Sequence, residues 1–157
     1  GNRMIKKILI SFLFIFIVSC GFQPMLKDFD VSSLVIKQIN YTGKNEFNYM
    51  LQNNLNLNQK PNSEGFIVNL ATSESISSVT KDTAGITTEE QITISIGLNV
   101  QDHMQNTLLT DTVSESSRLQ VTSNLGTDDT TKNIVRQKII TNLAQKIKFK
   151  LMILSKR

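Results

Sequence analysis

The sequence predicts an α+β fold: a two-layer sandwich in which a four-stranded, mostly antiparallel sheet carries two helices on one face, in the order β-α-β-β-β-α. The strongest observation is the strict alternation of apolar and polar residues over 91–101, which is typical of a strand with one buried face. The second is the apolar stripe at helical spacing over 130–154. A helix stripe and a half-apolar sheet bury their apolar surfaces against each other, which gives two layers.

The first two elements are a strand over residues 34–41 and a helix that follows it. The strand is rich in β-branched residues and ends at Thr42-Gly43, which is typical of a turn. The helix ends in the Asn-rich segment 53–59, before Pro61. Its apolar residues share one face, at Phe47, Met50, Leu51 and Leu55.

The next three strands form a meander over residues 66–79, 91–101 and 108–121, joined by turns at 81–85 and 102–106. The phase of the fourth strand stays open, because Val113 and Leu119 share it with the charged residues Asp111 and Glu115. The last helix covers residues 130–154, with acidic residues before its N-terminus, where the helix dipole favours them. Its predicted buried stripe is Ile140, Leu143, Ile147, Leu151 and Leu154.

Residues 1–19 have the organisation of a bacterial lipoprotein signal peptide. Basic residues precede an apolar run over 8–18, interrupted only by Ser11. At ~1.5 Å per residue this run reaches roughly 16 Å, about half of the ~30 Å hydrocarbon core, so it is too short to span a membrane. The run ends in the lipobox Ile17-Val18-Ser19-Cys20, and we expect cleavage between Ser19 and Cys20.

Cys20 is the only cysteine, and we expect its thiol to carry the lipid that anchors the protein to a membrane. This interpretation accounts for an unpaired cysteine in an exported chain. The alternative is an ordinary signal peptide with a chance cysteine. The predicted organisation is a removed signal peptide at 1–19, a lipidated tether at 20–33 and a single α+β domain at 34–157.

Charge is distributed unevenly along the mature chain. Residues 20–131 contain six Lys and Arg against thirteen Asp and Glu, whereas residues 132–157 contain eight Lys and Arg and no acid. Such asymmetry indicates contact with anionic lipid, lipopolysaccharide or an acidic protein face, or simple neutralisation within the molecule. Export excludes most nucleic acids, so we expect no nucleic-acid partner.

Residues capable of catalysis or metal binding are sparse. His103 is the only histidine and lies in a predicted turn, and one histidine with a lipidated cysteine forms no metal site. The pairs Glu89-Glu90 and Asp128-Asp129 are typical of a strand edge and a helix start, and no glycine-rich phosphate loop or nucleophile elbow is present. We therefore expect no enzymatic activity, no catalytic residues, no metal and no cofactor other than the covalent lipid on Cys20.

Two candidate binding surfaces remain. The polar phase of the third strand is either solvated or packs against another polar wall, and its candidate residues are Thr93, Ser95, Asn99 and Gln101. Phosphate recognition requires exposed cations. Lys81 and Arg118, isolated cations near strand ends, are the candidates for binding lipopolysaccharide, although the cations of the last helix are alternatives and all of them could be solvated.

The lipobox running into Cys20-Gly21-Phe22, followed by Pro24 and the predicted element order, resembles the lipopolysaccharide-assembly lipoprotein family LptE, in its alphaproteobacterial form. Gln23 departs from the basic residue common in that branch, and Met25-Leu26 replaces the more usual Leu-Tyr. The resemblance covers essentially the whole predicted mature chain.

The resemblance implies an outer-membrane lipoprotein that plugs the β-barrel LptD, helps to assemble it, and delivers lipopolysaccharide to the outer leaflet. It also implies sorting to the outer membrane, since Gly21 rather than Asp follows the cysteine. A polar, small-residue sheet face suits a barrel lumen, which is polar. The competing hypothesis is an envelope lipoprotein that binds or activates a peptidoglycan synthase through its sheet.

Overall fold

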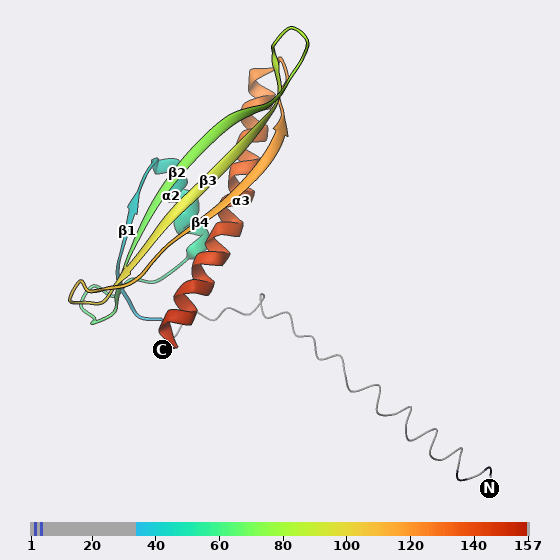
Figure 1. The fold of residues 1–157 in the computed structure, drawn as a ribbon. Helices are drawn as coiled ribbons and strands as arrows, with labels where there is room; N and C mark the ends of the chain where they lie inside the picture. Colours follow the sequence, from blue (N-terminus) through green and yellow to red (C-terminus); the bar gives the residue numbers. More distant parts are fainter. Residues whose placement is uncertain (1, 3, 5–33, 157) are drawn as a thin grey trace.

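The computed structural model describes residues 2, 4 and 34–156 (Figure 1). The predicted signal peptide, the cleavage position Ser19, the lipidation site Cys20 and the tether lie outside the described residues. Among the described residues no helix combines the length and the apolar character needed to cross a membrane. The elements are β1 (Ile36–Thr42), α2 (Asn45–Leu55), β2 (Phe66–Lys81), β3 (Thr87–Gln101), β4 (Thr107–Gln120) and α3 (Leu125–Ser155).

The four strands lie side by side in the order β1-β2-β3-β4. β1 pairs with β2 in parallel, whereas β2 with β3 and β3 with β4 are antiparallel hairpins. The parallel pair follows from the connection, because a strand that returns through a helix such as α2 runs in the same direction as the first. The predicted α+β sandwich with a mostly antiparallel sheet is confirmed, and the sheet is mixed.

Both helices cover the same face of the sheet (Figure 1). On β3 the inward residues are 0–1% exposed, and they are Ile92, Ile94, Ile96, Leu98 and Val100. Four of the five residues predicted for the helix stripe are fully buried, while Leu154 is half-buried at the edge of the core. The alternation and the helical spacing in the sequence therefore identify the core correctly.

The last helix begins earlier than predicted, at Leu125 rather than at residue 130. The side chain of Asn124 caps it by accepting a hydrogen bond of 3.1 Å from the Thr127 N–H. Asp128 is buried in the first turn, and its carboxylate accepts hydrogen bonds from the N–H (3.0 and 3.2 Å) and the hydroxyl (2.8 Å) of Thr122. These contacts join the end of β4 to the start of α3.

The molecule is elongated, with two distinct ends (Figure 1). At the end that we call proximal lie Leu34, the 56–65 loop, the β3–β4 turn at 102–106 and the last turns of α3. At the other, distal end lie the β2–β3 turn at 82–86, the β4–α3 connection at 121–124 and the first turn of α3. The strand register and the antiparallel course of α3 fix this arrangement, since Lys132 contacts Glu90 and Lys150 contacts Asp111.

Candidate binding surface on the outer face of the sheet

The sheet face opposite the helices is lined by small polar side chains from all four strands. The register places these residues in rows that cross the strands. The rows are Asn40-Asn69-Asn99-Thr110, Thr42-Ala71-Gly97-Thr112, Ser73-Ser95-Ser114, Ser75-Thr93-Ser116 and Ser77-Gln91-Arg118. We call these five rows the outer face.

One row is a continuous chain of side-chain hydrogen bonds across the sheet. The Asn40 amide donates to Asn69 Oδ1 over 2.7 Å, and the Asn69 amide donates to Asn99 Oδ1 over 3.1 Å. The Asn99 amide then donates to Thr110 Oγ1 over 3.3 Å. Because each amide both accepts and donates, the polar groups of this row satisfy one another without a charged residue.

Two further rows are linked by hydroxyl pairs. Thr93 Oγ1 lies 2.6 Å from Ser116 Oγ, and Ser95 Oγ lies 2.7 Å from Ser114 Oγ. Cross-strand hydroxyl pairs of this kind stabilise an antiparallel pair modestly. The polar groups of the outer face thus already form some hydrogen bonds with one another. Removing water from this face therefore costs less free energy than removing it from a charged surface.

The row between the amides and the hydroxyl pairs is hollow. Its centre is formed by Ala71 and Gly97, and a shallow hollow of about 260 Å³ lies over them between Thr42 and Thr112. A Cβ added to Gly97 would meet only Ala71, at 3.8 and 3.9 Å, which is ordinary contact. Packing among residues 34–156 therefore does not impose the absence of a side chain at Gly97.

Charge is nearly absent from the outer face. In its five rows Arg118 is the one ionisable side chain, and it lies in the most distal row. Arg118 is 65% exposed and pairs with Glu89 over 3.6 Å, so it is not the isolated cation that the sequence suggested.

The structure does not bring the two predicted lipopolysaccharide-binding cations together. Lys81 is the exposed last residue of β2, and Arg118 lies on β4, two strands away. Ser77 occupies the row of Arg118, so Lys81 is also four residues further along β2. Strand spacings of ~4.8 Å and ~3.3 Å per residue place their backbones on the order of 16 Å apart. Both residues belong to the distal end.

The four residues predicted to face a partner, Thr93, Ser95, Asn99 and Gln101, share one phase of β3, opposite its buried residues. Sequence reasoning missed the residues beside them on the other strands, foremost Asn40, Asn69, Ser114 and Ser116. The Ser- and Thr-rich stretches over 71–80 and 110–117 carried the signal, but only the register shows that they extend the same surface.

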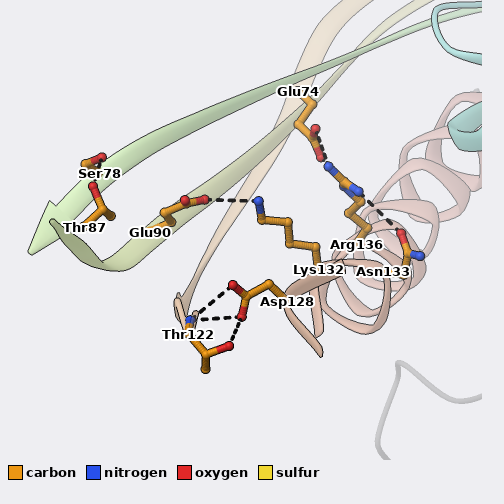
Figure 2. Close-up of polar contacts among 9 residues, drawn as sticks. All are labelled: Glu74, Ser78, Thr87, Glu90, Thr122, Asp128, Lys132, Asn133 and Arg136. Atoms are coloured by element: carbon orange, nitrogen blue, oxygen red, sulfur yellow. Dashed lines mark hydrogen bonds and ion pairs between the residues drawn. The ribbon is translucent and has the colours of Figure 1, made fainter. Parts of the chain in front are cut away.

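The basic residues of α3 fall into two groups, and the first fastens the helix to the sheet (Figure 2). Arg136 donates two hydrogen bonds, of 2.6 and 2.9 Å, to the carboxylate of Glu74, and this partner raises the pKa of the guanidinium. Lys132 lies 3.5 Å from Glu90 Oε2, and Lys150 pairs with Asp111. Neutralisation within the molecule thus accounts for three of the helix cations.

The second group of α3 cations has no acidic partner among residues 34–156. It consists of Lys138, Lys146, Lys148 and Lys156, none of which forms an ion pair there. The positions of these lysines between the buried residues place them on the solvent side or flanks of α3.

The residues considered for chemistry have structural surroundings. His103 is exposed in the β3–β4 turn. Beside it, the Asp102 carboxylate accepts hydrogen bonds from the N–H groups of Asn106 and Met104, which hold its pKa below the ordinary value and order the turn. Within residues 34–156, no three His, Cys, Asp or Glu side chains gather closely enough to hold a metal ion. The expectation that the protein is not an enzyme stays a prediction.

Together, a mixed four-stranded sheet with two helices on one face and a polar, nearly uncharged outer face define a small α+β domain. Neither a protein-family model nor a curated protein sequence matches the chain. Its fold is nevertheless found in solved bacterial lipoproteins, as two comparisons illustrate.

The crystal structure of rare lipoprotein B from Shewanella oneidensis superposes with a TM-score of 0.53 at 9% identity, over 70% of this chain and 89% of that one. The solution structure of lipoprotein B from Nitrosomonas europaea superposes with a TM-score of 0.55 at 14% identity, over 76% of this chain and 84% of that one. The chain has the fold of these lipoproteins.

Proposed function

We propose that this protein is an outer-membrane lipoprotein of the LptE family, anchored through Cys20, that plugs the barrel LptD and helps it to deliver lipopolysaccharide. The lipobox and the Cys20-Gly21-Phe22 start support the proposal from the sequence. The shared fold supports it from the structure, since rare lipoprotein B is also a bacterial lipoprotein.

The observation that carries the proposal is the outer face, and Gly97 above all. Glycine in the middle of a strand costs roughly 0.5–1 kcal/mol relative to alanine. Nothing within residues 34–156 requires it, because a Cβ at that position has room there. A glycine that the fold does not need is explained by an outside backbone or side chain that approaches the sheet there.

The outer face also has the composition that a polar barrel lumen requires. A plug must lose water over a wide area against a polar wall, which penalises exposed charge more than hydroxyl and amide groups. The amide row and the hydroxyl pairs present neutral groups over four strands. We propose Thr93, Ser95, Asn99 and Gln101 as the centre of the contact, with Asn69 and Ser114 beside them.

Lysines and arginines of the distal end are proposed to meet lipopolysaccharide. Lys81 and Arg118 stay the candidates, and their separation means that they would contact different phosphates or a single large headgroup region. Charge reversal at both positions, followed by a lipopolysaccharide pull-down, tests this part. Unchanged retention would remove it.

Co-purification after mild detergent extraction tests the plug. The wild-type lipoprotein is expected to be recovered with an outer-membrane barrel, and Gly97→Arg is expected to abolish this recovery while the variant stays folded. Gln137→Arg, which adds the same charge on the exposed side of α3, is the matched control and should co-purify normally. Recovery of the wild type alone, or with a peptidoglycan synthase, would contradict the proposal.

A further inference from the structure

The two ends of the molecule carry opposite charge. The proximal segments 34–38, 56–66, 101–109 and 146–156 contain six lysines against two acids, Glu64 and Asp102. The distal segments 78–92 and 116–134 contain three cations against five acids. The long axis of the domain therefore has a cationic proximal pole and an acidic distal pole.

Most of the proximal lysines are available to an external anion. Lys150 is paired with Asp111, whereas Lys37, Lys60, Lys146, Lys148 and Lys156 form no ion pair within residues 34–156. Leu143, Ile147 and Leu151 of α3 face the core. Helical geometry then places Lys146 and Lys148 on the two flanks of α3, and Lys156 follows its last residue and is exposed.

Exposed apolar side chains accompany these lysines. Met104, at the tip of the β3–β4 turn, is 72% exposed, and Leu108 beside it is 43% exposed. Ile153, in the last turns of α3, is also 43% exposed. Lysines interspersed with exposed apolar side chains are the composition of surfaces that lie at the headgroup level of a bilayer.

The chain length places this end near the predicted anchor. Residues 21–33 separate Cys20 from Leu34, and thirteen residues span at most ~45 Å. Leu34 belongs to the proximal end, so this pole lies closest along the chain to a lipid on Cys20.

We propose that the proximal end docks on an anionic phospholipid surface, through Lys146, Lys148 and Lys156 with Met104 and Ile153 touching the headgroup region. This electrostatic contact is a second membrane signal beside the lipid, and it orients the long axis away from the bilayer because the acidic pole is repelled. The proposal extends beyond the barrel partnership and does not depend on LptD.

Vesicle co-sedimentation tests the contact without the lipid. The mature chain with Cys20→Ala is suitable because it retains the whole domain of residues 34–156 and loses only the thiol that carries the lipid. It is expected to bind phosphatidylcholine vesicles that contain about one-third phosphatidylglycerol, and to release from them at high salt. Vesicles of phosphatidylcholine alone should bind it far less.

Two charge-matched variants locate the contact. Each lysine near an anionic surface contributes roughly fivefold in partitioning, so Lys148→Gln with Lys156→Gln should lower binding on the order of 25-fold. Lys44→Gln with Lys138→Gln removes the same charge away from the proximal end and should change binding by less than about twofold. Equal losses in both variants, or binding that ignores phosphatidylglycerol, would overturn the proposal.

The lipidated protein tests the orientation. With Cys20 acylated, an introduced cysteine is the single reactive thiol, so a fluorophore is placed at the exposed position Asn58→Cys or Ala84→Cys. A quencher carried by the lipids should suppress the proximal fluorophore in phosphatidylglycerol vesicles and spare the distal one. Equal quenching at both positions would contradict the docked orientation.

Discussion

The two faces of β3 differ although they belong to one strand. Ile94 and Ile96 are completely buried beneath the helices, whereas Thr93 and Ser95, their neighbours in sequence, are half-exposed on the outer face. The inner face is stabilised by close packing, since its side chains fill the space between the sheet and the helices. The outer face is held by lateral hydrogen bonds between strands.

This difference separates the residues that specify the fold from those that are free to serve a partner. An inner position is constrained from three sides by α2, α3 and adjacent strands, so its identity reports on folding. An outer position is constrained only by its cross-strand neighbours, so an unusual residue there, such as Gly97, reports on contact with something else.

The largest expected effect is on the inner face. Ile96→Ala should lower the free energy of unfolding by about 3 kcal/mol, because it removes buried methyl and methylene groups and leaves a cavity. Ser95→Ala, one position away, should change it by less than about 0.5 kcal/mol. Urea unfolding of both variants measures the contrast, and similar losses would show that the outer face is also part of the folding determinants.

The second effect concerns the ion pairs that join α3 to the sheet. Arg136→Met should destabilise by about 2 kcal/mol, since Glu74, only 7% exposed, would lose its bidentate partner. Lys132→Met is the control, because its pair with Glu90 lacks hydrogen-bond geometry and should contribute less than about 1 kcal/mol. Thermal unfolding at neutral pH distinguishes the two variants. If Arg136→Met leaves the stability unchanged, apolar packing alone holds α3 on the sheet.

The sequence predicted those features that a single segment reveals through its periodicity. The alternation in β3 and the stripe of α3 each report which side is buried, so both were correct. The start of α3 was missed, because Gly126 and the threonines that follow it are poor helix formers and the tertiary contact of Asp128 with Thr122 compensates for them.

Contacts between segments that are distant in the chain could not be predicted from the sequence. The phase of β4 was uncertain because Asp111 and Glu115 share the inward phase of Val113, and the structure explains it: Lys150 and Asn142 of α3 bind these two acids. Likewise, three residues of the outer face, Thr93, Ser95 and Asn99, were predicted on β3 alone, since their neighbours on β1, β2 and β4 are defined only by register.

The third effect tests the lateral bonds. Asn69→Ala should destabilise by about 1 kcal/mol, because the central amide of the row bonds to both Asn40 and Asn99. Thr110→Ala removes only the single bond at the other end of the row and should cost about half as much. If the two variants unfold at the same urea concentration, the row acts as one cooperative chain rather than as separate pairs.

The smallest effect is expected at Gly97, where the substitution should raise rather than lower the free energy of unfolding. Its outcome decides how the outer face is interpreted. Gly97→Ala should stabilise the isolated protein by about 0.5 kcal/mol, because alanine loses less backbone entropy and its Cβ meets Ala71 at an ordinary distance. The same methyl group would occupy the hollow between Thr42 and Thr112, so co-purification with the barrel should weaken even as stability rises. Ala71→Ser, across the same row, controls for a general change in polarity. A destabilised Gly97→Ala would show that the fold itself requires this glycine, and the main support for an external partner at the outer face would be lost.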